Sequence, residues 1–167
     1  MLITFPDHAG RSDDLEALKA AHWIDLVDPT REEIARVEQA FGIAIPTRES
    51  LLEIEASSGL RAREGILYLS APLIAGTDGD HWQLAPTGFI LNGNWLVTIR
   101  FAEFGAFDAV RNTIARDDCT APQILIFILE EIVDRAADFL ERAAEGLTEV
   151  STTRPGGCAI RWSGSAG

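Results

Sequence analysis

The sequence predicts an α/β (α+β) domain in which a mixed parallel and antiparallel sheet is sandwiched between helices and a long acidic amphipathic helix ends the domain. Three observations support this prediction. Short apolar segments bounded by turn residues recur through the first hundred positions, as strands do. Helical apolar periods occur before and after these segments, so helices are expected to cover one sheet. The last helical period, over residues 121–150, is much longer than the others.

The first predicted elements are two strands and a helix. Residues 2–5 and 23–26 are short apolar segments with strand character. A helix start follows the second segment, because Asp28 can accept N–H groups of a first turn and Pro29 lacks an N–H and suits the first helical position. Gly42 is expected to end this helix.

The middle of the chain predicts one more helix and then sheet. A short helix is expected to begin at Thr47 and to run towards residues 57–59. Residues 65–71 are apolar on both faces and too short for a helix, which favours a buried strand. Residues 89–91 and 95–99 flank Asn-Gly and predict a hairpin, since Asn-Gly tolerates the positive φ angles of a tight two-residue loop.

Two helices are predicted after the sheet, and the second contains candidate metal-binding carboxylates. The first contains an apolar stripe over residues 107–114, and the second covers residues 121–150. On a wheel of about 3.6 residues per turn the second helix separates into two faces. The apolar face holds Leu125, Ile132, Ala136, Phe139, Ala143, Leu147 and Val150. The acidic stripe opposite it holds Glu130, Asp134, Asp138, Glu141, Glu145 and Glu149.

The acidic stripe is open to two interpretations. Carboxylates on one side of a helix attract hard divalent cations such as Mg²⁺, which makes Asp134 and Asp138 candidate metal ligands. A charged face opposite an apolar face is also what an ordinary surface helix shows. Two pairs at i,i+4 spacing, Glu131 with Arg135 and Asp138 with Arg142, fit that alternative. Glu53 and Glu55 form a second, weaker candidate pair, because residues two apart diverge on a helix and converge only if it unwinds.

Composition excludes several classes of function. The chain has 167 residues, 47% of them apolar, which suits a single domain. With 14 Lys and Arg against 26 Asp and Glu its formal charge is −12, which disfavours nucleic-acid and anionic-membrane binding. The longest apolar run covers residues 124–129, far short of the ~20 residues of a membrane span. Two cysteines in no paired spacing and an N-terminus without a signal sequence indicate a cytoplasmic protein.

Common enzyme signatures are absent from the sequence. It contains no GxGxxG after a strand, no GxxxxGK[ST], no HExxH and no GxSxG. Its three histidines lie far apart and outside any metal-ligand spacing. We therefore predict no catalytic residues and no organic cofactor.

The order of the motifs resembles a known family, the cytoplasmic domain of CorA-like divalent cation transporters, which include magnesium channels and zinc transporters. The resemblance covers about residues 2–150. The segments that carry it are Trp23-Ile24-Asp25-Leu26 with Asp28-Pro29-Thr30 and Glu33, Phe41-Gly42-Ile43 with Pro46, Leu60-Arg61, Leu67-Tyr68-Leu69, Gly88-Phe89-Ile90-Leu91 with Trp95-Leu96-Val97-Thr98-Ile99-Arg100, Phe107-Asp108-Ala109-Val110-Arg111, and Leu129-Glu130-Glu131-Ile132-Val133-Asp134.

The resemblance implies a partner set and a regulatory site. Full-length members continue into a stalk and two membrane helices with a Gly-Met-Asn signature, which this sequence lacks, and assemble as homopentamers at the cytoplasmic face of the membrane. Copies of this chain and the stalk and membrane helices are then the expected partners. Magnesium-gated members bind cations between subunits, and Glu53 and Glu55 are the nearest counterparts here of the family's acidic pair.

Three functional hypotheses follow from the sequence. The first is a cation-sensing cytoplasmic domain of a transporter for magnesium, zinc or cobalt, without the membrane pore. The second is a metal-independent assembly or scaffold domain. The third is a small cytosolic enzyme, which the missing motifs disfavour. A metal-dependent change in melting temperature distinguishes the first hypothesis from the second.

Residues 151–167 differ from the rest and are predicted to be a flexible or non-native tail after a domain at 1–150. They contain no acidic residue and no apolar period. Deleting them is expected to change the melting temperature little, as measured by calorimetry. A fall of more than about 10 °C, roughly 2 kcal/mol for a domain of this size, would show that the tail packs on the core.

Overall fold

The computed structural model describes residues 1–5, 15–53, 59–76, 83–114 and 119–152. For residues 149–152 only the backbone is described. Within these ranges six strands form one sheet in the order β1-β2-β6-β5-β4-β3. β2 and β6 are parallel and all other neighbours are antiparallel, so the predicted mixed sheet is confirmed. The strands are β1 (Leu2–Phe5), β2 (Trp23–Val27), β3 (Leu60–Arg63), β4 (Ile66–Ala75), β5 (Gln83–Leu91) and β6 (Leu96–Arg100).

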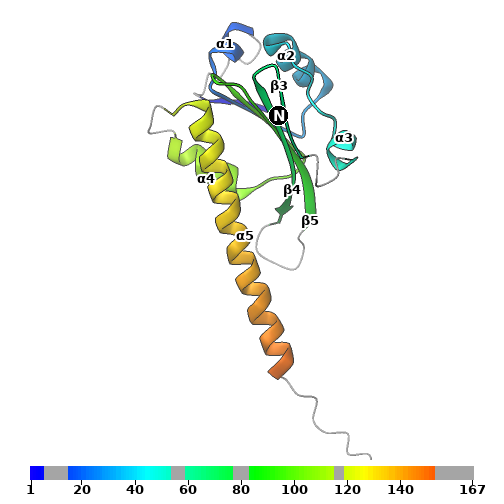
Figure 1. Cartoon of the computed structure of the whole chain (residues 1–167), viewed down its shortest axis with the longest axis vertical. Helices are drawn as coiled ribbons and strands as arrows, with labels where there is room; N and C mark the ends of the chain where they lie inside the picture. The colour runs from blue at the N-terminus through cyan, green and yellow to red at the C-terminus, as the bar shows by residue number, and fades with distance from the viewer. Residues whose placement is uncertain (6–14, 54–58, 77–82, 115–118, 153–167) are drawn as a thin grey trace, which may run out of the picture.

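Helices cover both faces of the sheet, as the sequence predicts (Figure 1). One face packs against Phe107 of α4 and Ile124 of α5. The opposite face packs against Val37 of α2 and Leu51 of α3. The helices are α1 (Leu15–Ala20), α2 (Arg31–Phe41), α3 (Arg48–Glu53), α4 (Gly105–Ile114) and α5 (Ala121–Thr152).

The N-terminus of α2 differs from the prediction. The helix begins at Arg31, and Thr30, not Asp28, is its N-cap, with Thr30 and Glu33 closing a reciprocal capping box. Asp28 instead has a φ of 41° and donates its N–H to the carbonyl of Arg100 at 2.8 Å. Asp28 therefore prolongs the contact between β2 and β6 and cannot cap the helix. The predicted end of the helix is confirmed, because Gly42 has a φ of 66°.

The turns also differ in part from the prediction. β5 and β6 form the expected hairpin, but Gly93 is not among the glycines with positive φ in the described ranges. The tight turn with positive φ at both central residues lies between β3 and β4, at Glu64 (53°) and Gly65 (77°).

β4 is longer than predicted because it continues past Pro72, which lies opposite Pro86 on β5. α3 is described only to Glu53, so the prediction for residues 54–58 lies outside the described part.

A charged network is buried where β2, β6 and α4 meet. Arg100 has no exposed side-chain surface and donates to both carboxylate oxygens of Asp25 at 3.0–3.2 Å. Thr98 donates to Asp25 at 2.7 Å and itself accepts from the Trp23 indole at 3.0 Å. All four side chains lie on the α4 side of the sheet because alternate residues of a strand share a face.

The same network continues into α4 and the segment before it. The Arg100 guanidinium lies 4.9 Å from the centre of the Phe107 ring and also donates to Glu103 at 2.9 Å. Burial of the guanidinium opposes its charged form, but the hydrogen bonds and Coulomb attraction of Asp25, followed by those of Glu103, outweigh this cost and raise the pKa of Arg100. Arg100 therefore stays charged and orients the start of α4.

Breaking the buried pair is expected to destabilise the domain strongly. Asp25→Ala leaves the Arg100 charge buried without its main partner, which costs about 3–5 kcal/mol of unfolding free energy in urea titrations. Glu103→Gln is the matched control, because Glu103 is 70% exposed and the expected loss is below about 1 kcal/mol. Equal losses for the two variants would contradict this account.

Candidate functional site

Those of the predicted metal ligands that the structure describes lie on opposite sides of the sheet. Glu53 is the last residue of α3 and is exposed, whereas Glu55 lies outside the described residues. Asp134 and Asp138 are exposed on α5, one helical turn apart. Because α3 and α5 pack on different faces, the structure does not bring Glu53 together with the α5 carboxylates (Figure 1).

The α5 carboxylates line an open hollow on the surface of their own helix. Glu131, Asp134 and Asp138 surround it together with Arg135 and Ala137. Arg135 forms an ion pair with Glu131 at 3.6 Å. In the described ranges no three His, Cys, Asp or Glu side chains gather as a group that could hold a metal ion. The hollow therefore offers hydrated cations an acidic surface without a preformed cage.

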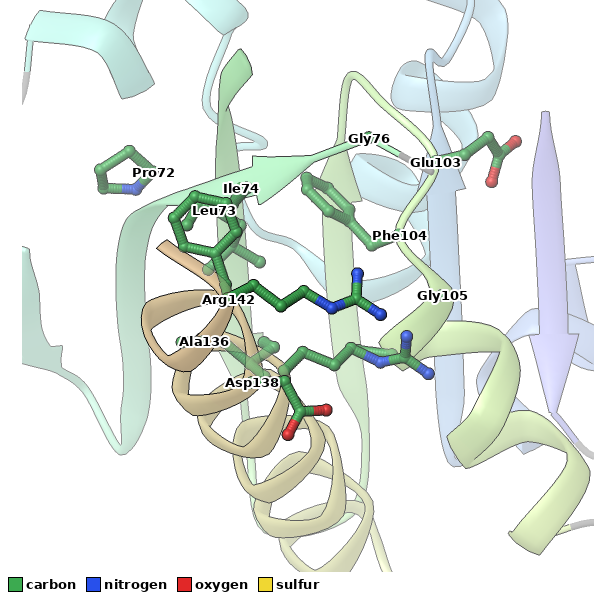
Figure 2. A pocket seen from close by; sticks show the side chains of 14 residues that line it. Pro72, Leu73, Ile74, Gly76, Glu103, Phe104, Gly105, Ala136, Asp138 and Arg142 are labelled. Carbon is green, nitrogen blue, oxygen red and sulfur yellow. The ribbon is translucent and has the colours of Figure 1, made fainter. Parts of the chain in front are cut away.

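Asp138 also lies at the rim of a cleft of about 450 Å³ between α5, the start of α4 and the end of β4. The cleft is lined by Pro72, Leu73, Ile74, Gly76, Glu103, Phe104, Gly105, Ala106, Ile132, Arg135, Ala136, Asp138, Phe139 and Arg142. Figure 2 shows that Arg142 extends from α5 towards Phe104 and Gly105, whereas the Asp138 carboxylate turns away. The predicted Asp138–Arg142 ion pair is therefore not formed.

Arg135 and Arg142 add positive charge to one side of the acidic α5 surface. Arg135 reaches the N-terminus of α4, where a methyl group at Gly105 would lie 2.9 Å from its Nη1. Arg142 points into the same cleft, so positive charge borders Asp138 on one side. These guanidinium groups repel a divalent cation near Asp138. Asp134, Glu141 and Glu145 lie further from the two arginines around the circumference of the helix. Asp134 is the better placed of the two predicted α5 ligands.

This geometry suits weak binding of a hydrated ion. Mg²⁺ retains several waters and is commonly held by one or two carboxylates, a donor set that Asp134 with Glu131 can supply. Exposed carboxylates pay little desolvation cost, but they also gain little from Coulomb attraction in water. The ion pair that the sequence predicts between Glu131 and Arg135 is formed, and the structure places Glu131 beside Asp134 in the hollow, although the sequence does not single it out as a candidate ligand.

Comparison with known proteins decides the family. The model of the family described as CorA-like Mg²⁺ transporter protein matches residues 19–153. This chain belongs to the CorA-like family. The magnesium transport protein CorA of Mannheimia succiniciproducens is 30% identical to it over 142 residues, and that of Wolinella succinogenes is 33% identical over 130 residues. The family consists of transporters, not enzymes, as the sequence predicts.

The CorA-like chain spans less than half the length of these relatives. The alignments cover 83% and 74% of this chain but only 45% and 40% of the two transporters. No helix in the described ranges has both the length and the apolar character needed to cross a membrane.

Solved structures share the fold of the CorA-like chain. The soluble domain of CorA from Methanocaldococcus jannaschii aligns with a TM-score of 0.58 at 19% identity, over 78% of this chain and 54% of that one. The cytoplasmic domain of ZntB from Vibrio parahaemolyticus aligns with a TM-score of 0.58 at 15% identity, over 76% and 53% of the two chains. At these identities the likeness establishes the architecture alone.

Proposed function

We propose that this chain is the cytoplasmic, cation-sensing regulatory domain of a CorA-like divalent metal ion transporter, with magnesium as the first ion to test and zinc or cobalt as alternatives. The observation that carries the proposal is the family match over residues 19–153, which includes the whole of β2 to β6 and α2 to α5. The fold shared with a CorA soluble domain and a ZntB cytoplasmic domain supports it.

The proposal includes partner helices that lie outside this sequence. The relatives are more than twice as long as the matched part, so a membrane pore and stalk helices would lie in the remainder of such a transporter. In that setting copies of this domain assemble as a homopentamer at the cytoplasmic face of the membrane. Residues 1–150 then form the domain, and residues 151–167 remain a tail without an assigned role.

In this proposal the regulatory cation binds weakly to α5 and more tightly only when another subunit completes its ligand set. Asp134 and Asp138 supply carboxylates on the exposed side of α5, and Glu53 with Glu55 supplies a second acidic position near the end of α3. Separate, incomplete sites on opposite sides of one domain suit an ion shared between neighbouring copies.

A specific observation favours a second function, a metal-independent assembly domain. Asp134 and Asp138 are exposed, and no group of side chains that could hold a metal ion is found in the described part of α5. Arg135 and Arg142 further reduce the negative potential at Asp138. An acidic surface of this kind also keeps a domain soluble without any response to metal.

Thermal melts at constant ionic strength test the sensing proposal. MgCl₂ is expected to raise the melting temperature more than NaCl does, because an ion that binds only the folded state adds about 2.7 kcal/mol at 100 times its Kd. Asp134→Asn/Asp138→Asn should remove most of the difference between the two salts.

The matched control removes two carboxylates from other elements. Glu32→Gln/Glu64→Gln changes the net charge equally at two exposed positions, so it should keep the Mg²⁺ effect. Identical melts of the wild type in the two salts would reject cation sensing by this chain alone and favour the assembly domain.

A further inference from the structure

A single buried side chain attaches α3 to the sheet. Of the six residues of α3 only Leu51 is buried, with 8% of its surface exposed, whereas its neighbour Leu52 is 64% exposed. α3 lies on the face of the sheet opposite α5 (Figure 1). Isolated helices shorter than about 12–15 residues are marginal in water, so a helix of this length persists only where it packs on something else. The position of α3 therefore depends on Leu51.

Leu51 packs in a notch that a glycine provides. Gly88 of β5 has no side chain, and a Cβ at this position would lie 2.8 Å from Cγ2 of Ile99 on β6 and 3.3 Å from Cδ2 of Leu51. The missing side chain is what allows Leu51 to approach the sheet this closely. We call the space above Gly88, beside Ile99, the Gly88 notch.

Other contacts hold α3 less firmly. The Arg48 guanidinium lies 5.7 Å from the centre of the Phe101 ring, a contact that contributes little when the arginine is exposed. The hydroxyl of Thr47 accepts a hydrogen bond from the N–H of Ser50 at 3.2 Å, which caps the helix but does not attach it to the sheet. Neither contact replaces the burial of Leu51.

The chain just before α3 is held independently of it. Ile45 is buried in the core on this face, and its N–H donates to the Glu38 carboxylate of α2 at 2.9 Å. Only Pro46 and Thr47 lie between this anchor and Arg48. Rotation of the backbone at these two residues can therefore move α3 without moving α2.

We propose that α3 is a detachable helix, which leaves the sheet as a unit when Leu51 withdraws from the Gly88 notch while the sheet stays folded. Detachment exposes one buried side chain, whereas unfolding of the sheet exposes the apolar core on both of its faces, so detachment costs much less free energy. It also moves Glu53, the last residue of α3. Only this last consequence rests on the proposed function, in which Glu53 supplies an acidic position for the regulatory cation.

Hydrogen exchange of the full chain, followed by NMR in the absence of divalent metal, tests the proposal. In the wild type the amides of residues 50–53 are expected to exchange at least about a hundredfold faster than those of β6, yet more slowly than in an unstructured chain. In Leu51→Ala they should lose their remaining protection, because the docked helix loses its anchor, while β6 stays protected by more than about a hundredfold. No metal is present, so a failure of cation sensing would not alter this result.

Matched substitutions distinguish detachment at the notch from other causes. Leu52→Ala makes the same change one residue further along, on an exposed side chain, and should leave the exchange of α3 within about threefold of the wild type. Gly88→Ala should detach α3 as Leu51→Ala does, because the new methyl group fills the notch. Gly93→Ala should not, since a Cβ there meets no atom within 4 Å.

Three outcomes would overturn the proposal. Equal protection of the α3 and β6 amides in the wild type would show that α3 unfolds only together with the sheet. Loss of β6 protection along with that of α3 in Leu51→Ala would show the same. Equal effects of Leu51→Ala and Leu52→Ala would show that the short helix frays without any dependence on the Gly88 notch.

Discussion

The ion pair between Asp25 and Arg100 is the interaction on which the arrangement of this domain depends. It joins the parallel strands β2 and β6 at the centre of the sheet and reaches α4 through the ring of Phe107. A buried ion pair is costly unless every polar atom has a partner, and here Thr98, Trp23 and Glu103 supply the additional hydrogen bonds. The network therefore favours one register of β6 against β2 and one position for the start of α4, which in turn forms a wall of the cleft beside α5.

α5 presents different chemistry on each of its sides. Its first turns bury Ile124 and Ile128 against the sheet, and Arg135 and Arg142 line the cleft further along. The remaining surface carries the acidic stripe.

Family membership and the geometry of this domain bear on different parts of its function. The match over residues 19–153 establishes a CorA-like domain, and the architecture agrees with a CorA soluble domain. Of the four candidate metal ligands, the three that the structure describes, Glu53, Asp134 and Asp138, lie as separate, exposed groups on α3 and α5. Under the proposed function, ligands from a second chain complete the cation site, so the single chain is expected to bind the ion only weakly.

The sequence by itself determined the elements whose signals are local. Apolar segments placed β1, β2, β6 and the end of β5, Gly42 ended α2, and the long apolar period placed α5. Only the tertiary structure decided where charged residues go, because their environment depends on neighbours distant in the chain. Asp28 became part of the β2–β6 contact and left the cap to Thr30, Arg142 turned into the cleft and away from Asp138, and Asp25 was buried against Arg100. Spacing along one helix or strand shows which side chains share a face. It does not show which element packs on that face, and this packing decides which charged side chains are buried and which ion pairs they form.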